Sequence, residues 1–152
     1  MVASHAVVFM WELFCKEVER GFQFLEAEYG FELVSAENPN VVYESSLVRI
    51  FVFYDSSRGG ETDLRIRRKS DDPFSPMSLG IEMLCRMESE TEYEVGRISS
   101  RESLQNEVTR LANALARCGS TLLVGDLRVF RRLEDQEKQF SRKYSRRMKE
   151  NL

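Results

Sequence analysis

"LVRIFVFYDSSRGGETDLRIRRK", residues 47–69, decides the fold of this chain. Residues 47–54 are apolar on both faces of an extended strand, which is typical of a central strand with a layer packed on it. Residues 55–60 are turn formers. In residues 62–69, Leu64 and Ile66 alternate with charged side chains, as in a half-buried strand. Because the connection is too short for a parallel crossover, we expect the two strands to pair antiparallel.

The sequence before this hairpin predicts a helix followed by two shorter strands. Between residues 9 and 29, apolar residues recur every three or four positions and glutamates occupy much of the opposite face. Gly30 is a natural helix end, and Gly21 marks a close packing contact inside the helix. Residues 31–35 and 41–44 are β-like and flank the turn sequence "ENPN" at 37–40.

The sequence after residue 69 is predicted to be helical. Two prolines interrupt residues 70–76, and a short helix is expected near residues 79–85. Ser99 and Glu102 fit a capping box at the start of a helix that Gly119 ends. Gly125 and Asp126 then follow apolar sequence and precede a basic segment. A phosphate-binding loop would carry several glycines after a strand, so we interpret this pair as a joint between helices, with Asp126 as N-cap.

These elements predict a single α+β domain over residues 1–152. An N-terminal helix packs on a small antiparallel β-meander of three to four strands, and a helical C-terminal half completes the core. The chain has 152 residues, 42% hydrophobic and 31% charged, which is the profile of a soluble globular domain. Residues 1–8 and 146–152 are expected to be frayed.

The chemistry-bearing residues are few. Cys15, Cys85 and Cys118 are odd in number and far apart, which favours buried free thiols in a reducing cytosol. With His5 as the single histidine, we expect neither a metal site nor a cofactor, and mechanisms that depend on histidine lack their central residue. Catalysis by a pair of carboxylates remains an alternative among 25 acidic residues. We expect no enzyme activity and no membrane span.

An acidic run is the first candidate binding surface. Glutamates occupy every second position of "ESETEYEV", residues 88–95, and share one face if the segment is extended. These residues are Glu88, Glu90, Glu92 and Glu94. Such a surface would suit a basic protein partner, and a solvated loop is the alternative.

A basic strand and a basic C-terminal helix are the second candidate. The residues are Arg65, Arg67, Lys69, Arg142, Lys143, Arg146 and Arg147. Residues 127–152 carry nine Lys or Arg against four acidic residues, a net charge of +5, so the overall −3 leaves −8 on residues 1–126. Nucleic-acid binding would require aromatic side chains on the same exposed face to stack bases. We expect none at the exposed positions of residues 62–69, so a solvated face is favoured.

The order of features resembles a group of small uncharacterised bacterial cytosolic proteins, some of which are similar to immunity proteins for polymorphic toxins. Three stretches carry the resemblance: "FLEAEYGFEL" (24–33), "VVYESSLVRIFVFYD" (41–55) and "LANALARCGSTLLVGDLRVFRRLE" (111–134). It implies an α+β domain without catalytic residues that binds a toxin through a case-specific surface. The long basic end after Leu133 and the acidic run are not part of this pattern.

The leading hypothesis is therefore a non-enzymatic cytosolic binding protein with a protein partner, an immunity-type inhibitor of a basic toxin. Three alternatives remain: a nucleic-acid-associated protein, an enzyme that uses carboxylates, and a self-assembling module that buries its apolar N-terminal helix.

Overall fold

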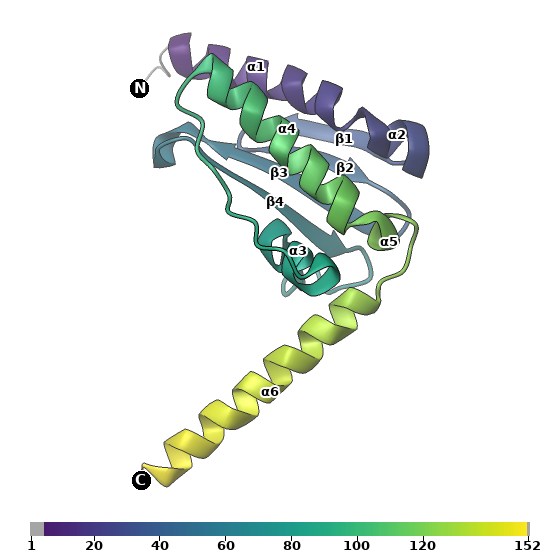
Figure 1. Cartoon of the computed structure of the whole chain (residues 1–152), viewed down its shortest axis with the longest axis vertical. Coiled ribbons are helices and arrows are strands. Elements are labelled where there is room, and N and C mark those ends of the chain that lie inside the picture. The colour runs from purple at the N-terminus through teal and green to yellow at the C-terminus, as the bar shows by residue number, and fades with distance from the viewer. Residues whose placement is uncertain (1–4, 152) are drawn as a thin grey trace.

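A five-stranded antiparallel sheet forms the centre of the molecule (Figure 1). The computed structural model describes residues 5–151, with side chains from Phe9 onward. The strands are β1 (Glu32–Glu37), β2 (Asn40–Glu44), β3 (Val48–Asp55), β4 (Glu61–Arg68) and β5 (Ser78–Gly80), and they pair in chain order. The predicted α+β meander is confirmed, with β3 in its centre. The one-turn helix η1 (Ser56–Arg58) occupies the predicted loop between β3 and β4.

β5 is the strand that the sequence did not predict. Residues 79–85 were expected to be helical, but residues 78–80 pair with β4, where Arg65 faces Gly80 and Arg67 faces Ser78. The helix α3 (Ile81–Ser89) starts directly after this strand. Three residues carry too little periodicity to distinguish a strand from a helix turn, and only the partner strand decides between them.

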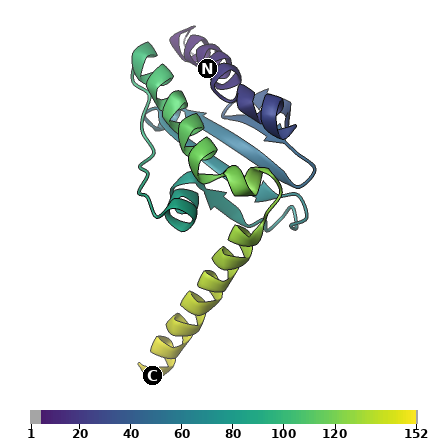
Figure 2. The same cartoon turned by 45° about the vertical axis from the view of Figure 1, so that its right-hand side comes forward.

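All helices but the last gather on one face of the sheet (Figures 1 and 2). The helices are α1 (His5–Gly21), α2 (Gln23–Tyr29), α3, α4 (Arg101–Cys118), α5 (Ser120–Leu123) and α6 (Arg128–Glu150). Helices α1 and α4 run side by side over the sheet, and α3 covers its β4 side (Figures 1 and 2). The side chains between these layers form the core, and each large apolar side chain buried there contributes about 1.5–3 kcal/mol. They include Phe14, Val18, Ile50, Val52, Leu64, Ile66, Val108 and Leu111.

The predicted helix over residues 9–29 is broken at Phe22, which lies between α1 and α2. The glycine before the break sits against α4: a Cβ on Gly21 would lie 3.4 Å from Val108 Cγ1 and 3.8 Å from Ala112 Cβ. The predicted close packing contact is thus present. At the other end, Gly30 ends α2 in the left-handed conformation, as expected.

The start of α4 is shifted by one residue from the prediction. Ser100, not Ser99, is the N-cap, and Ser103 takes the place predicted for Glu102. The hydroxyl of Ser103 accepts hydrogen bonds from the amides of Ser99 and Ser100, both at 2.9 Å. A serine therefore completes the capping box, because its hydroxyl reaches the amide of the N-cap residue.

The joint between α5 and α6 has the predicted character. Gly125 has φ +104°, and the carboxylate of Asp126 accepts a hydrogen bond from the amide of Arg128 at 3.1 Å. Leu127, rather than Asp126, is the N-cap of α6. Helix α6 then points away from the body of the molecule (Figure 1). Of the ends expected to be frayed, residues 1–4 and 152 lie outside the described residues, while α1 begins at His5 and α6 ends at Glu150.

Candidate binding face

The second face of the sheet is open. No helix within residues 5–151 lies over it (Figures 1 and 2). Because side chains alternate along a strand, burying Ile50, Val52 and Tyr54 against the helices turns Phe51 and Phe53 of β3 toward this open face. The pairing of β3 with β4 places Phe51 opposite Arg65 and Phe53 opposite Asp63.

A hollow of about 680 Å³ lies on the open face. Its floor is formed by β3 and β4, and residues 95–97 form one wall. This wall is held beside the start of β4 by hydrogen bonds, since the amide of Ile98 donates to the Gly60 carbonyl at 2.8 Å and the Thr62 hydroxyl donates to the Gly96 carbonyl at 3.0 Å. Four arginines line the hollow: Arg58, Arg65, Arg67 and Arg97.

Three of these arginines are paired with a carboxylate. Arg65 Nε donates to Asp63 at 3.2 Å. Arg58 lies 3.6 Å from Asp55, and Arg97 lies 3.8 Å from Glu61. Within the described part of the chain, Arg67 forms no ion pair.

Arg67 instead stacks on an aromatic ring. Its Cζ atom lies 4.8 Å from the centroid of Phe51, and its Nε is buried without a hydrogen-bond partner. A guanidinium stacked on a ring keeps its in-plane N–H groups free to bind a planar anion such as a carboxylate or a phosphate. The hollow therefore contains one guanidinium without a carboxylate partner, that of Arg67, together with the apolar ring of Phe53.

Asp63 lies on the same face of β4 as Arg67, four residues away along the strand. Burial raises its pKa above the usual 3.8, against the hydrogen bond from the Leu64 amide and the charge of Arg65. It lies at the boundary between this hollow and a second one lined by α3 and α6. Its bonds to Arg65 and to the Leu64 amide hold it in place.

Protein-family models, curated proteins and solved structures give no match to this chain. The resemblance to immunity proteins thus stays a prediction from the sequence.

The structure brings together only two of the predicted basic residues. Arg65 and Arg67 share the hollow, whereas Lys69 follows the end of β4 and donates to Glu44 at 2.9 Å. The other four lie on the exposed part of α6, outside the hollow. These are Arg142, Lys143, Arg146 and Arg147.

The expectation that the exposed positions of residues 62–69 carry no aromatic side chain is correct for that strand. It considered residues 62–69 alone, but the aromatic side chains belong to the neighbouring strand and reach the same face through the strand pairing. The sequence did contain an indication of these side chains. Residues 47–54 are apolar on both faces, and only one face can pack on the helices.

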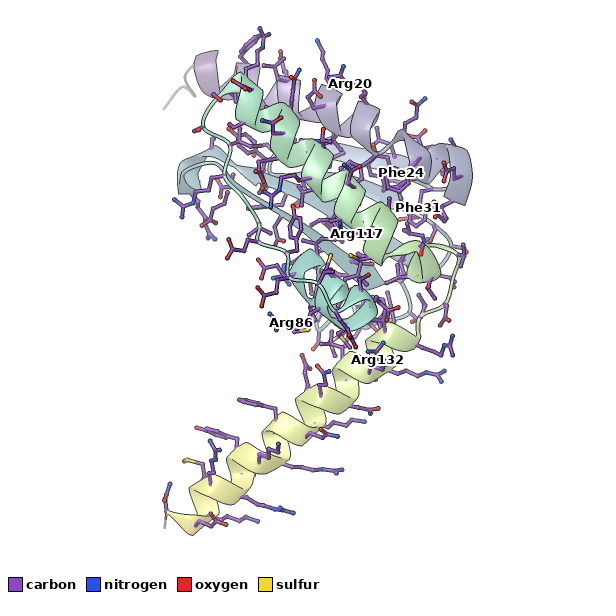
Figure 3. The ribbon with its side chains drawn as sticks, in the orientation of Figure 1. Arg20, Phe24, Phe31, Arg86, Arg117 and Arg132 are labelled. Carbon is purple, nitrogen blue, oxygen red and sulfur yellow. The ribbon has the colours of Figure 1, made fainter. Side chains whose placement is uncertain are left out.

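The four glutamates of the acidic run do not belong to one segment. Glu88 is in the last turn of α3, where it accepts a hydrogen bond from Arg132 of α6 at 2.8 Å (Figure 3). Glu90 ends α3 with φ 51°. Glu92 and Glu94 follow in an irregular stretch and are exposed. Three of the predicted residues therefore remain on an exposed stretch, without Glu88.

The cysteines are free thiols, with Cys85 and Cys118 buried and Cys15 half-buried. Burial raises the pKa of Cys85 to about 12. Within the described residues, no group of three or more acidic, histidine or cysteine side chains could hold a metal ion. No helix in this part of the chain combines the length and apolar character needed to cross a bilayer. The side chain of His5 lies outside the described residues.

Proposed function

We propose that this chain is a non-enzymatic cytosolic binding protein, an immunity-type inhibitor that binds its protein partner with the open face of the sheet. The observation that supports this most directly is Arg67, stacked on Phe51 at the hollow without a carboxylate partner. Arginine and aromatic side chains in a concave setting are the residues that most often dominate the energy of protein interfaces.

The chemistry of the hollow defines the group that it would receive. An acidic side chain of the partner would place its carboxylate on the free N–H groups of Arg67, with apolar atoms against Phe53. The acids already in the hollow, Glu61 and Asp63, are held by Arg97 and Arg65. A surface of mixed sign suits a folded protein surface better than a uniformly anionic polymer.

This proposal moves the binding surface away from the acidic run. Glu88 is bound to Arg132, and the remaining glutamates border an irregular stretch rather than a concave surface. The partner is therefore expected to present an acidic group at the contact with Arg67, whatever its overall charge.

Affinity capture with substituted chains tests the proposal. Partners retained from native lysate by the natural chain would be compared with those retained by Arg67→Ala and by Phe53→Ser, and the affinity would then be measured with the purified partner. We expect each substitution to weaken binding at least tenfold, or about 1.4 kcal/mol. Arg20→Ala is a matched control, because Arg20 is an exposed arginine that is paired with Glu17 on α1, in the helical layer on the other face of the sheet. A partner that binds all three chains equally would refute the assignment of this face.

A second candidate function is the binding of single-stranded nucleic acid, and the observation that favours it is Phe51 and Phe53 on an open sheet beside arginines. Exposed rings on a sheet can stack bases. The net charge of −8 on residues 1–126 opposes it. Fluorescence anisotropy with labelled single-stranded RNA and DNA distinguishes the two: affinity that falls steeply with salt and is lost in Arg67→Ala would favour nucleic acid.

A further inference from the structure

Beyond residue 134, α6 buries no side chain against the described part of the molecule. Val129, Phe130 and Leu133 are buried against the body, but every residue from 135 to 151 is exposed. Figure 3 shows the side chains of this part pointing into solvent on both sides of the helix. Residues 135–150 span about 24 Å at 1.5 Å per residue. A helix of this length is marginally stable in water without a packing partner.

An apolar stripe follows this exposed half. Phe140, Tyr144 and Met148 are four residues apart, so they lie on one face, and they are 72%, 59% and 54% exposed. Leu133, one heptad before Phe140, is buried on the body and continues the same face. The face of α6 that packs on the body at Leu133 therefore continues as an exposed apolar stripe.

Charge changes sign along the same helix. Residues 134–137 contain three acidic side chains, and residues 138–149 contain six basic ones and no acidic one. Two such helices side by side in parallel would place like charges together. In the antiparallel arrangement, the basic end of each lies beside the acidic start of the other.

The body offers a matching surface at the start of α6. A groove of about 840 Å³ lies between α6 and the loop after β4. Asp72 and Glu137 line it and form no ion pair within the described residues, and Lys138 and Arg142 line it as well. In the same loop, Phe74 is 96% exposed. The groove thus offers acids without an ion pair, and the loop that borders it carries an exposed ring. Together they complement a helix that is basic and apolar.

We propose that the occupant is a second copy of this chain. Two copies pair their α6 helices antiparallel around a two-fold axis near Arg142, which places Phe140 of each beside Tyr144 of the other. In this register Arg147 of each copy lies beside Glu137 of the other, and the basic end of the helix lies next to Asp72. This surface is self-complementary, as a two-fold dimer requires. This surface consists of α6 and the loop after β4, whereas the hollow on the open sheet face is lined mainly by β3, β4 and residues 95–97. An anionic polymer or lipid surface would attract the basic end but leave the acidic start of α6 and Phe74 without a role.

The oligomeric state of the full chain tests this proposal. Sedimentation velocity from about 1 µM to about 1 mM should show a reversible dimer, since a contact of this size is expected to be weaker than a standard interface. The double substitution Arg146→Glu/Arg147→Glu should raise the dissociation constant at least tenfold. Adding Asp72→Lys and Glu137→Lys to this variant should restore the dimer. Because all four residues are on the surface, circular dichroism should show an unchanged fold. A chain that stays monomeric over the whole range overturns the proposal.

Cross-linking tests the orientation separately. In a Cys15→Ser background, Ser141→Cys places a thiol next to the two-fold axis and should form an intermolecular disulfide under mild oxidation. Ser145→Cys lies further from the axis and should cross-link much less in the antiparallel pair. Equal cross-linking of both variants indicates a parallel pair and refutes the proposed arrangement.

Discussion

Arg68, the last residue of β4, forms an ion pair with Glu134 on α6. The same guanidinium lies 3.0 Å from Asp71 and 4.9 Å from the ring centroid of Phe130. Burial lowers the pKa of Arg68, but the hydrogen bonds to Glu134 and Asp71 outweigh that effect and raise it. A single cation, with 17% of its side chain exposed, thus attaches α6 to the sheet.

Replacing this cation is expected to loosen the start of α6. Arg68→Ala leaves Glu134 and Asp71 facing each other without a counter-charge, and we expect a loss of about 2 kcal/mol in the free energy of unfolding. Urea denaturation measures the loss. Arg49→Ala removes an exposed ion pair with Glu44 and should cost less than about 1 kcal/mol. Equal losses for the two variants would show that the Arg68 cluster does not contribute more than a surface pair.

The wall of the hollow depends on a glycine. Gly60 has φ +79°, and a Cβ at this position would lie 2.1 Å from the carbonyl oxygen of Ile98. Gly60→Ala must therefore displace residues 96–98 as well as strain the backbone, and we expect a loss of about 3 kcal/mol or more. Gly30→Ala is the control. Gly30 has φ +70° with open space around it, so only the backbone strain of about 1 kcal/mol is expected. Thermal denaturation should show that Gly60→Ala is clearly less stable than Gly30→Ala. A similar loss of stability in both variants would contradict the role of the close contact between residue 60 and the Ile98 carbonyl.

Two buried phenols lack a hydrogen-bond partner, and this predicts how they respond to substitution and to pH. The hydroxyl groups of Tyr43 and Tyr93 are buried and unpaired. Removing an unsatisfied polar group costs little, so Tyr43→Phe and Tyr93→Phe should leave the free energy of unfolding within about 1 kcal/mol or raise it. A loss of several kcal/mol in chemical denaturation would indicate that these hydroxyl groups are bonded in solution.

Burial raises the pKa of Tyr93 to about 12, and it also raises the pKa values of Tyr43 and Tyr54. Because the folded state disfavours the phenolate, this contribution to stability is fully present below the ordinary value of 10.0 and is lost as pH rises toward 12. Absorbance at the phenolate band should therefore show a late group of tyrosines that titrates together with unfolding. Titration of all tyrosines near pH 10 with the fold intact would contradict this result.

The sequence predicted the fold more completely than the site. Alternation in residues 62–69 and the three-to-four spacing around Leu104 and Val108 are local patterns, so they identify β4 and α4 without knowledge of the partners. β5 and the Arg68–Glu134 pair depend on which segments meet. Residues 68 and 134 are far apart in the chain, and nothing local marks them as neighbours.

The same distinction explains the site. Arg65 and Arg67 stand out as exposed charges within one strand. Phe51 is their neighbour only through the register of β3 against β4, in which Phe51 faces Arg65. The sequence did show that Phe51 is an apolar residue at an outward position of a central strand. Such a residue indicates a binding surface only if no second layer covers that face, and the sequence alone does not show whether such a layer exists.

The joint before α6 gives a final prediction. Arg128 Nε donates to both carboxylate oxygens of Asp126 at 3.0 Å, and this bond, together with the bond from the Arg128 amide, lowers the pKa of Asp126 to about 2. Because the folded state favours the carboxylate, its contribution to stability is present above the ordinary value of 3.8 and is lost as pH falls toward 2. Arg128→Gln should therefore raise the pKa of Asp126 toward 3.8, measured from the NMR shift of its carboxyl carbon. Arg131→Gln changes an exposed charge one turn later on α6 and should leave the pKa near 2. If both substitutions shift the titration equally, the effect comes from the overall charge of the helix, and Asp126 is not fixed at the joint by Arg128.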